Sequence, residues 1–170
     1  MGNGGTCGII ENWACDLSLH PFVSDDKQTA AKTARRLRVQ TLPNSLSKLT
    51  GLTNDLGFSN AYSEELKSWA QEGDLLVGVS GSGNSANIVQ ALERGRTLGL
   101  QTVLITRNPN SQGAKFANIV ICTAMDSKFP GQNTSGNMAN FYMEDFVCQL
   151  SHITAGLLKE HVQTNDGQPA

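Results

Sequence analysis

The chain has 170 residues, of which 39% are hydrophobic and 16% charged, and its formal net charge is −2. This size and composition fit one globular domain with its own core. The charge balance argues against a nucleic-acid-binding protein, because the one dense cationic stretch, ARRLR at 34–38, is too short for such a surface. Neither a membrane-spanning run nor a signal peptide is visible, so we expect a cytoplasmic protein without a membrane partner.

Predicted strands and helices alternate along the chain. The first helix is expected at 8–20, and a strand is expected at 36–42, where apolar and polar residues alternate up to Pro43. The continuous apolar run at 74–80 is typical of a strand that is buried on both faces. The later elements are a helix at 86–99, strands at 101–106 and 118–123, a short helix at 111–117 and a long helix from about 137 to 161.

This order predicts an α/β fold with a parallel sheet covered by helices. In the helix at 86–99, Ile88, Leu92 and Gly95 share one face, and Gly99 is a suitable C-terminal glycine. Ligands of such sheets bind at the carboxyl ends of the strands, against helix N-termini.

One glycine- and serine-rich loop occupies such a strand end, in the stretch VSGSGNSANIV at 79–89. Serine hydroxyls and the backbone at the glycines suit a phosphate at a helix N-terminus. The loop lacks the lysine of a nucleotide-binding P-loop and does not read G-x-G-x-x-G, which favours a phosphate monoester. A plain turn into a helix explains the loop alone equally well. The donors concerned are Ser80, Gly81, Ser82, Gly83 and Ser85.

A second glycine loop, GNGGT at 2–6, also leads into a predicted helix, and its Asn3 and Thr6 would add donors. Two such loops on neighbouring strand ends would form a cup around one ligand. The four cysteines form no C-x-x-C pair, so we expect buried, reduced thiols rather than a catalytic cysteine. They are Cys7, Cys15, Cys122 and Cys148.

GNGGT, TNDLGF at 53–58 and the segment GDLLVGVSGSGNS at 73–85 together resemble the SIS (sugar isomerase) domain family, and more narrowly its phosphoheptose isomerase group. The resemblance runs from Gly2 to about Glu160. It implies a three-layer sandwich with a five-stranded parallel sheet, a homotetramer, and isomerisation of sedoheptulose 7-phosphate through an enediol. We expect one such domain at 1–162, without the first strand that family members have before the glycine loop, and a disordered tail at 163–170.

The same resemblance implies roles for individual residues. Asp16 and His152 would form the acid–base pair, brought together across a subunit interface. The residues holding the sugar phosphate would be Asn3, Gly4, Thr6, Asn54, Asp55, Ser80, Gly81, Ser82, Ser85 and Glu144.

Four positions depart from the family pattern. Asp16 stands where the family has Glu, and Glu144 where it has Gln. Asn12 replaces a histidine that binds zinc in some members, and His20 replaces a phosphate-binding arginine. Zinc therefore remains an open cofactor assignment, with Asp16, Glu144 and His152 as candidate ligands.

The spacing of these residues suits proton transfer. Aldose–ketose exchange needs a base beside a carbonyl and an acid for the neighbouring carbon, and histidine has a suitable ordinary pKa of ~6.5. Residues four apart lie on one face of a helix. Two such stripes are present, Asn12–Asp16–His20 and Glu144–Cys148–His152.

Two classes of function remain open from the sequence. The first is a sugar-phosphate isomerase, for a heptose or for a shorter ketose such as a hexulose phosphate. The second is a non-catalytic SIS module that senses a phosphosugar or binds a protein partner, such as a replication initiator. The Asp16–His152 pair favours the enzyme, because a pure binding module has no use for it.

Overall fold

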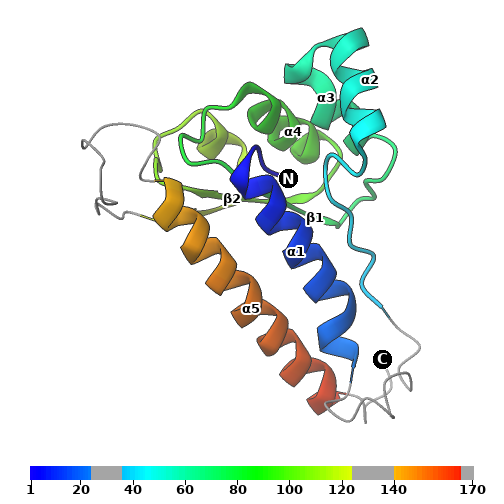
Figure 1. Ribbon diagram of the computed structural model, residues 1–170, viewed down its shortest axis with the longest axis vertical. Coiled ribbons are helices and arrows are strands. Elements are labelled where there is room, and N and C mark those ends of the chain that lie inside the picture. Colours follow the sequence, from blue (N-terminus) through cyan, green and yellow to red (C-terminus); the bar gives the residue numbers. More distant parts are fainter. Residues whose placement is uncertain (24–35, 124–139, 166–170) are drawn as a thin grey trace.

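The computed structural model describes residues 1–23, 36–123 and 140–165 (Figure 1). Among these residues, no helix has the length and apolar character needed to cross a membrane. The described residues contain two 3-10 helices, η1 (His20–Phe22) and η3 (Gly113–Phe116). The α-helices are α1 (Gly5–Leu19), α2 (Leu46–Leu56), α3 (Phe58–Leu66), α4 (Ala86–Thr97) and α5 (Asn140–Asn165), and the strands are β1 (Leu75–Val79), β2 (Gln101–Thr106) and β3 (Ile119–Cys122).

The sheet is parallel, in the order β1–β2–β3. Val77 pairs with Val103, and Ile105 pairs with Ile121. The prediction of an α/β fold with a parallel sheet is confirmed. The five strands expected from the resemblance are not present in the described residues, which contain three.

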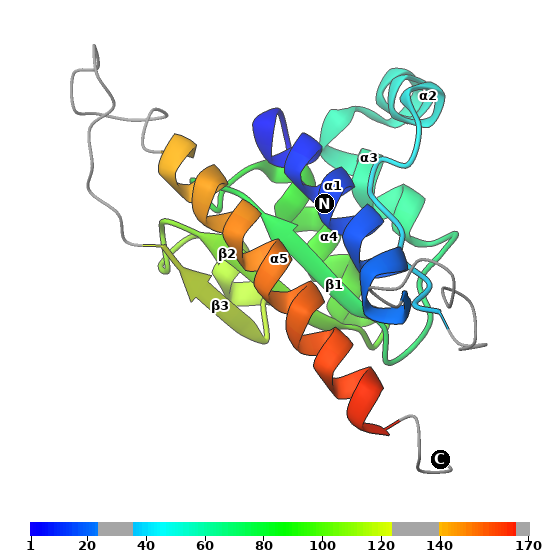
Figure 2. The same ribbon diagram turned by 60° about the horizontal axis from the view of Figure 1, so that its bottom comes forward.

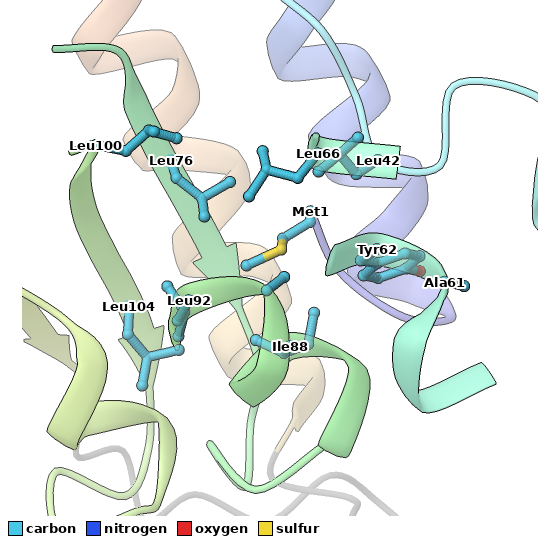
Figure 3. Packing of buried hydrophobic residues seen from close by; sticks show 11 residues of the cluster. Met1, Leu42, Ala61, Tyr62, Leu66, Leu76, Ile88, Leu92, Leu100 and Leu104 are labelled. Atoms are coloured by element: carbon cyan, nitrogen blue, oxygen red, sulfur yellow. The ribbon is translucent and has the colours of Figure 1, made fainter. Parts of the chain in front are cut away.

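Helices cover both faces of this sheet, so the fold has three layers (Figure 2). On one face, α3 and α4 contribute Tyr62, Ile88 and Leu92 to a core that Leu76 and Leu104 of the strands complete (Figure 3). On the other face, Ile10 of α1 and Met143 and Val147 of α5 pack against Val79 and Ile105. Alternate strand residues therefore point into opposite layers, as a pleated strand requires.

The predicted face of α4 is confirmed. Ile88 and Leu92 are fully buried, and Gly95 lies so close to the sheet that a Cβ would stand 2.7 Å from Leu76 Cδ2. Gly99 follows the helix with a φ of +78°, a conformation that glycine adopts without strain.

The prediction of a strand at 36–42 is wrong, because no strand in the described part of the chain pairs with this segment. It is held by side chains instead: the Arg38 guanidinium donates to the Trp69 carbonyl and to Asp74, and Leu42 is buried. The helix expected at 111–117 is shorter than predicted and is the single 3-10 turn η3.

The strand β1 is covered on both faces as predicted, with Leu76 in one core and Val79 in the other, although Leu75 at its start is 63% exposed. Two smaller predictions need correction. The thiols are free but not buried, because Cys15 and Cys122 are exposed and the other two half-buried. Helix α5 continues to Asn165, past the expected domain end at 162, and residues 166–170 lie outside the described residues.

Met1 continues the sheet at the outer edge of β1. Its amine donates to the Val77 carbonyl at 2.8 Å, and its carbonyl accepts from the Val79 amide at 2.9 Å. Burial lowers the pKa of this amine to about 5. The pairing anchors the start of the first glycine loop at the carboxyl end of β1.

Candidate functional site

The N-termini of three helices meet at the carboxyl edge of the sheet. The side chains of Asn3, just before α1, and Asn87, in the first turn of α4, are hydrogen-bonded to each other. Asn140, the first residue of α5, lies so close to Gly81 that a Cβ there would overlap its Oδ1 atom. Each helix N-terminus carries a partial positive charge and unpaired N–H groups, so this edge favours an anion.

The serine loop between β1 and α4 forms a tight turn. The Gly83 amide donates to the Ser80 carbonyl at 3.0 Å, and the Ser80 hydroxyl contacts that of Ser85 at 3.4 Å. Ser85 precedes α4, but its side chain does not cap the helix. Ser82 is exposed and accepts from the Asn84 amide. The loop thus places the hydroxyls of Ser82 and Ser85 beside the N-terminus of α4, whereas the Ser80 hydroxyl is buried and bonded within the turn.

The segment that connects β2 to η3 is hydrogen-bonded to the serine loop and holds it in place. The Gly113 amide donates to the Gly83 carbonyl at 2.9 Å, and the Gln112 amide donates to Asn84 Oδ1 at 2.8 Å. The Thr106 hydroxyl donates to the Gly81 carbonyl at 3.3 Å. The sequence interpretation missed this support. Its only signal was the turn-rich NPNSQG at 108–113 directly after a strand.

Replacing Gly83 with Ala should destabilise the fold and weaken anion binding. The backbone φ of +65° disfavours a side chain, and a Cβ would overlap Ser111 Oγ and stand 2.9 Å from Thr106 Oγ1. We expect a loss of about 2 kcal/mol in the free energy of unfolding. Urea denaturation would measure it. Gly51→Ala in α2, where no atom lies near the added Cβ, is the matched control and should be neutral or slightly stabilising.

A buried hydrogen-bond network joins the two glycine loops. Asn3 and Asn87 exchange side-chain hydrogen bonds at 2.8 and 3.0 Å, and the Tyr62 hydroxyl from α3 lies 2.8 Å from the Gly2 carbonyl oxygen. The Thr6 hydroxyl donates to the Asn3 carbonyl at 2.7 Å, which uses its only hydrogen. In this structure Asn3 and Thr6 therefore shape the loop. Sequence reasoning missed both Asn87 and Tyr62.

Replacing Asn87 with Ala should cost about 1–3 kcal/mol of stability, since the Asn3 amide then loses both of its bonds to a buried partner. Asn87 is 2% exposed, so water would not readily take its place. Asn110→Ala, at an exposed position after β2, is the control and should change stability by less than about 0.5 kcal/mol. Equal effects of the two substitutions in thermal or urea denaturation would contradict a structural role for the network.

Glu144 lies one turn beyond Asn140 on α5, beside the start of α1. A Cβ on Gly5 would stand 2.8 Å from Glu144 Oε1. Burial raises the pKa of the Glu144 carboxyl above its usual value, and the charge of Asp145 adds to the increase. The carboxylate makes no hydrogen bond or ion pair with any residue in the described part of the chain.

Asp16 stands between two histidines further along the helices. His152 Nε2 lies 3.7 Å from Asp16 Oδ2, and His20 Nε2 lies 3.5 Å from Asp16 Oδ1. The Asn12 amide also donates to Asp16 Oδ2 at 3.2 Å. The Asp16 side chain is largely buried, whereas His20 and His152 are mostly exposed. A single chain is thus sufficient to bring Asp16 and His152 together.

The Asp16–His152 pair lies far from the serine loop of its own chain. Helices α1 and α5 both begin at the carboxyl edge of the sheet and run away from it side by side (Figures 1 and 2). Asn140 touches Gly81 of the loop, and His152 is twelve residues further on, a rise of about 18 Å along α5. A ligand in the loop is therefore adjacent to Glu144 and distant from Asp16 and His152 of the same chain.

The remaining predicted site residues do not join these groups. Asn54 and Asp55 are exposed at the end of α2, where the Asn54 amide donates to Asp55 Oδ1. Within the ranges that the structure describes, no three histidine, cysteine or acidic side chains gather closely enough to hold a metal ion. Of the three candidate zinc ligands, Asp16 and His152 lie together, whereas Glu144 lies apart from them beside Gly5.

Two relatives with similar sequences are named as phosphoheptose isomerases. A probable phosphoheptose isomerase of Thermoplasma volcanium is 36% identical over 150 residues, which cover 88% of this chain and 69% of the relative. The phosphoheptose isomerase of Sulfurimonas denitrificans is 35% identical over 127 residues, covering 74% of this chain and 60% of the relative. The chain therefore spans about 60–70% of the length of these two relatives.

Solved structures show the same fold. A phosphoheptose isomerase from Neisseria gonorrhoeae matches with a TM-score of 0.69 at 20% identity, and one from Francisella tularensis with 0.70 at 18%. Both matches cover 94% of this chain and 74% of the other. A family model described as the SIS domain matches residues 28–144, more than half of the chain. The chain belongs to the SIS domain family and is related to the phosphoheptose isomerases.

Proposed function

We propose that the protein is a sugar-phosphate isomerase that converts sedoheptulose 7-phosphate to glycero-manno-heptose 7-phosphate. The main support is the carboxyl edge of the sheet, where three helix N-termini and the serine loop surround a site suited to a phosphate. The relatives' names supply the class of sugar.

In the proposed reaction, Ser80, Ser82 and Ser85 hold the phosphate, and the Asp16–His152 pair moves the carbon-bound proton. A base removes a proton from carbon 1, which gives an enediol, and an acid returns a proton to carbon 2. The Asp16–His152 pair acts on a sugar bound in the serine loop of a second copy, because about 18 Å separates the pair from the loop of its own chain.

A homo-oligomer, for which we propose the tetramer, fits the surface of α1 and α5. Leu19 on α1 and Ile153 and Leu157 on α5 are all more than half exposed, although they are large apolar side chains. Contact between copies along these helices would cover them and place one copy's Asp16–His152 pair near another copy's loop.

Hydrogen exchange at carbon 1 of sedoheptulose 7-phosphate tests the proposal. The protein is incubated with the ketose in heavy water, and NMR follows the loss of the carbon-1 proton signal. Exchange together with new aldose signals supports the isomerase. Binding of the sugar phosphate without exchange would favour the sensing module instead. Exchange with a shorter ketose phosphate, and none with sedoheptulose 7-phosphate, would show that the shorter sugar is the substrate.

A further inference from the structure

Several titratable groups besides the Asp16–His152 pair lie near the glycine loops, and the proposed chemistry gives Glu144 no part in proton transfer. Cys7 and Tyr62 have partners of their own, since the thiol contacts Glu11 at 4.0 Å and the phenol contacts the Gly2 carbonyl. Glu144 has no such partner among the described residues, and it is half-buried at the rim of the site.

We propose that Glu144 is a catalytic acid–base group that carries protons between the two reacting oxygens of the sugar. This inference rests on the proposed isomerase function. Asn140 and Glu144 are one helical turn apart and so share a face of α5. That face lies against both glycine loops, with Asn140 at Gly81 and the carboxylate of Glu144 at Gly5. A sugar whose phosphate sits in the serine loop therefore has this carboxyl group within one turn of its anchor.

Isomerisation requires such a group in addition to the carbon acid–base pair. When the base takes the proton from carbon 1, the carbonyl oxygen on carbon 2 must gain a proton to form the enediol. Protonated Glu144 donates that proton to O2. Its carboxylate then takes the proton from the O1 hydroxyl as carbon 2 is protonated and the C1 carbonyl forms. Glu144 ends protonated again, so the cycle balances without an oxidant or reductant.

The environment of Glu144 suits this exchange. Its carboxylate is half-buried beside Gly5, at the edge where the two glycine loops meet. No described residue donates a hydrogen bond to it, so its oxygens can bond to the sugar hydroxyls.

Glu144→Gln separates proton transfer from binding, because glutamine keeps the size and hydrogen-bonding ability of the side chain but cannot carry the proton. We expect kcat for sedoheptulose 7-phosphate to fall about 10²- to 10³-fold while KM changes less than about threefold. Competitive inhibition by inorganic phosphate should be unchanged. Glu144→Asp, which keeps a carboxyl, should retain at least about tenfold more activity than the glutamine variant.

Glu160→Gln is the matched control, at an exposed position of the same helix, and should leave kcat unchanged. Circular dichroism and the melting temperature establish that each variant is folded. An active wild type with an equally active Glu144→Gln variant would overturn this inference alone and leave Glu144 a binding residue. A folded wild type that isomerises no ketose phosphate would overturn the proposed function and this inference with it.

Discussion

The His152→Ala variant is expected to lose isomerase activity by about 10³-fold while still binding phosphate. His152 Nε2 lies 3.7 Å from Asp16 Oδ2, so the imidazole and the carboxylate can face the same bound sugar. Phosphate binding should survive, because the serine loop is about 18 Å away along α5 and its hydrogen bonds do not involve His152. Steady-state kinetics and inhibition by inorganic phosphate measure the two effects separately.

Asp16→Asn gives the complementary test, since it keeps the shape of the side chain and removes its charge. We expect a loss of similar size, and the double variant should lose little more than either single one, as residues acting as a unit do. His161→Ala, nine residues further along α5, is the control and should keep wild-type kcat. Full activity of both Asp16→Asn and His152→Ala would remove the pair from the mechanism.

The periodic part of the fold could be predicted from the sequence, because one strong local signal marks each of its elements. The apolar runs that became β1, β2 and β3 and the face of α4 with Ile88 and Leu92 are such signals. The segment at 36–42 shows the limit of this reasoning. Alternation predicts an extended chain, but a strand also needs a neighbour, and here Arg38 and Leu42 anchor the chain without one.

Part of the candidate site could also be predicted, namely the residue types that bind a phosphate at a helix N-terminus. The sequence could not reveal which of these hydrogen-bond donors are bonded to other groups of the protein rather than available to a ligand. Thr6 and Asn3 look like ligand donors in GNGGT, yet their hydrogen bonds go to the loop and to Asn87, from a distant helix. Glu144 likewise resembled a simple binding residue until the structure placed its carboxylate beside Gly5.

Mixing two inactive variants is expected to restore activity, and this second large effect tests whether each site is shared between copies. Ser82→Glu places a negative charge at the exposed tip of the serine loop and should repel the phosphate without disturbing the core. His152→Ala removes the proton-transfer group. Each variant alone should be almost inactive.

Activity should recover because the serine loop and the Asp16–His152 pair of one chain lie too far apart to act on the same sugar. If the loop of one copy works with the Asp16–His152 pair of another, random assembly of equal amounts leaves about one quarter of the sites with both parts intact. Mixed oligomers, formed by co-expression, should therefore show about a quarter of wild-type kcat. Co-expression of His152→Ala with Asp16→Asn is the control, and it should restore nothing, because the 3.7 Å contact places both residues in the same chain. If the Ser82→Glu and His152→Ala mixture also stays inactive while size-exclusion chromatography shows mixed oligomers, then a single chain must complete its own site. In that case the approximately 18 Å between the loop and the pair would have to close by movement of α1 and α5 relative to the sheet.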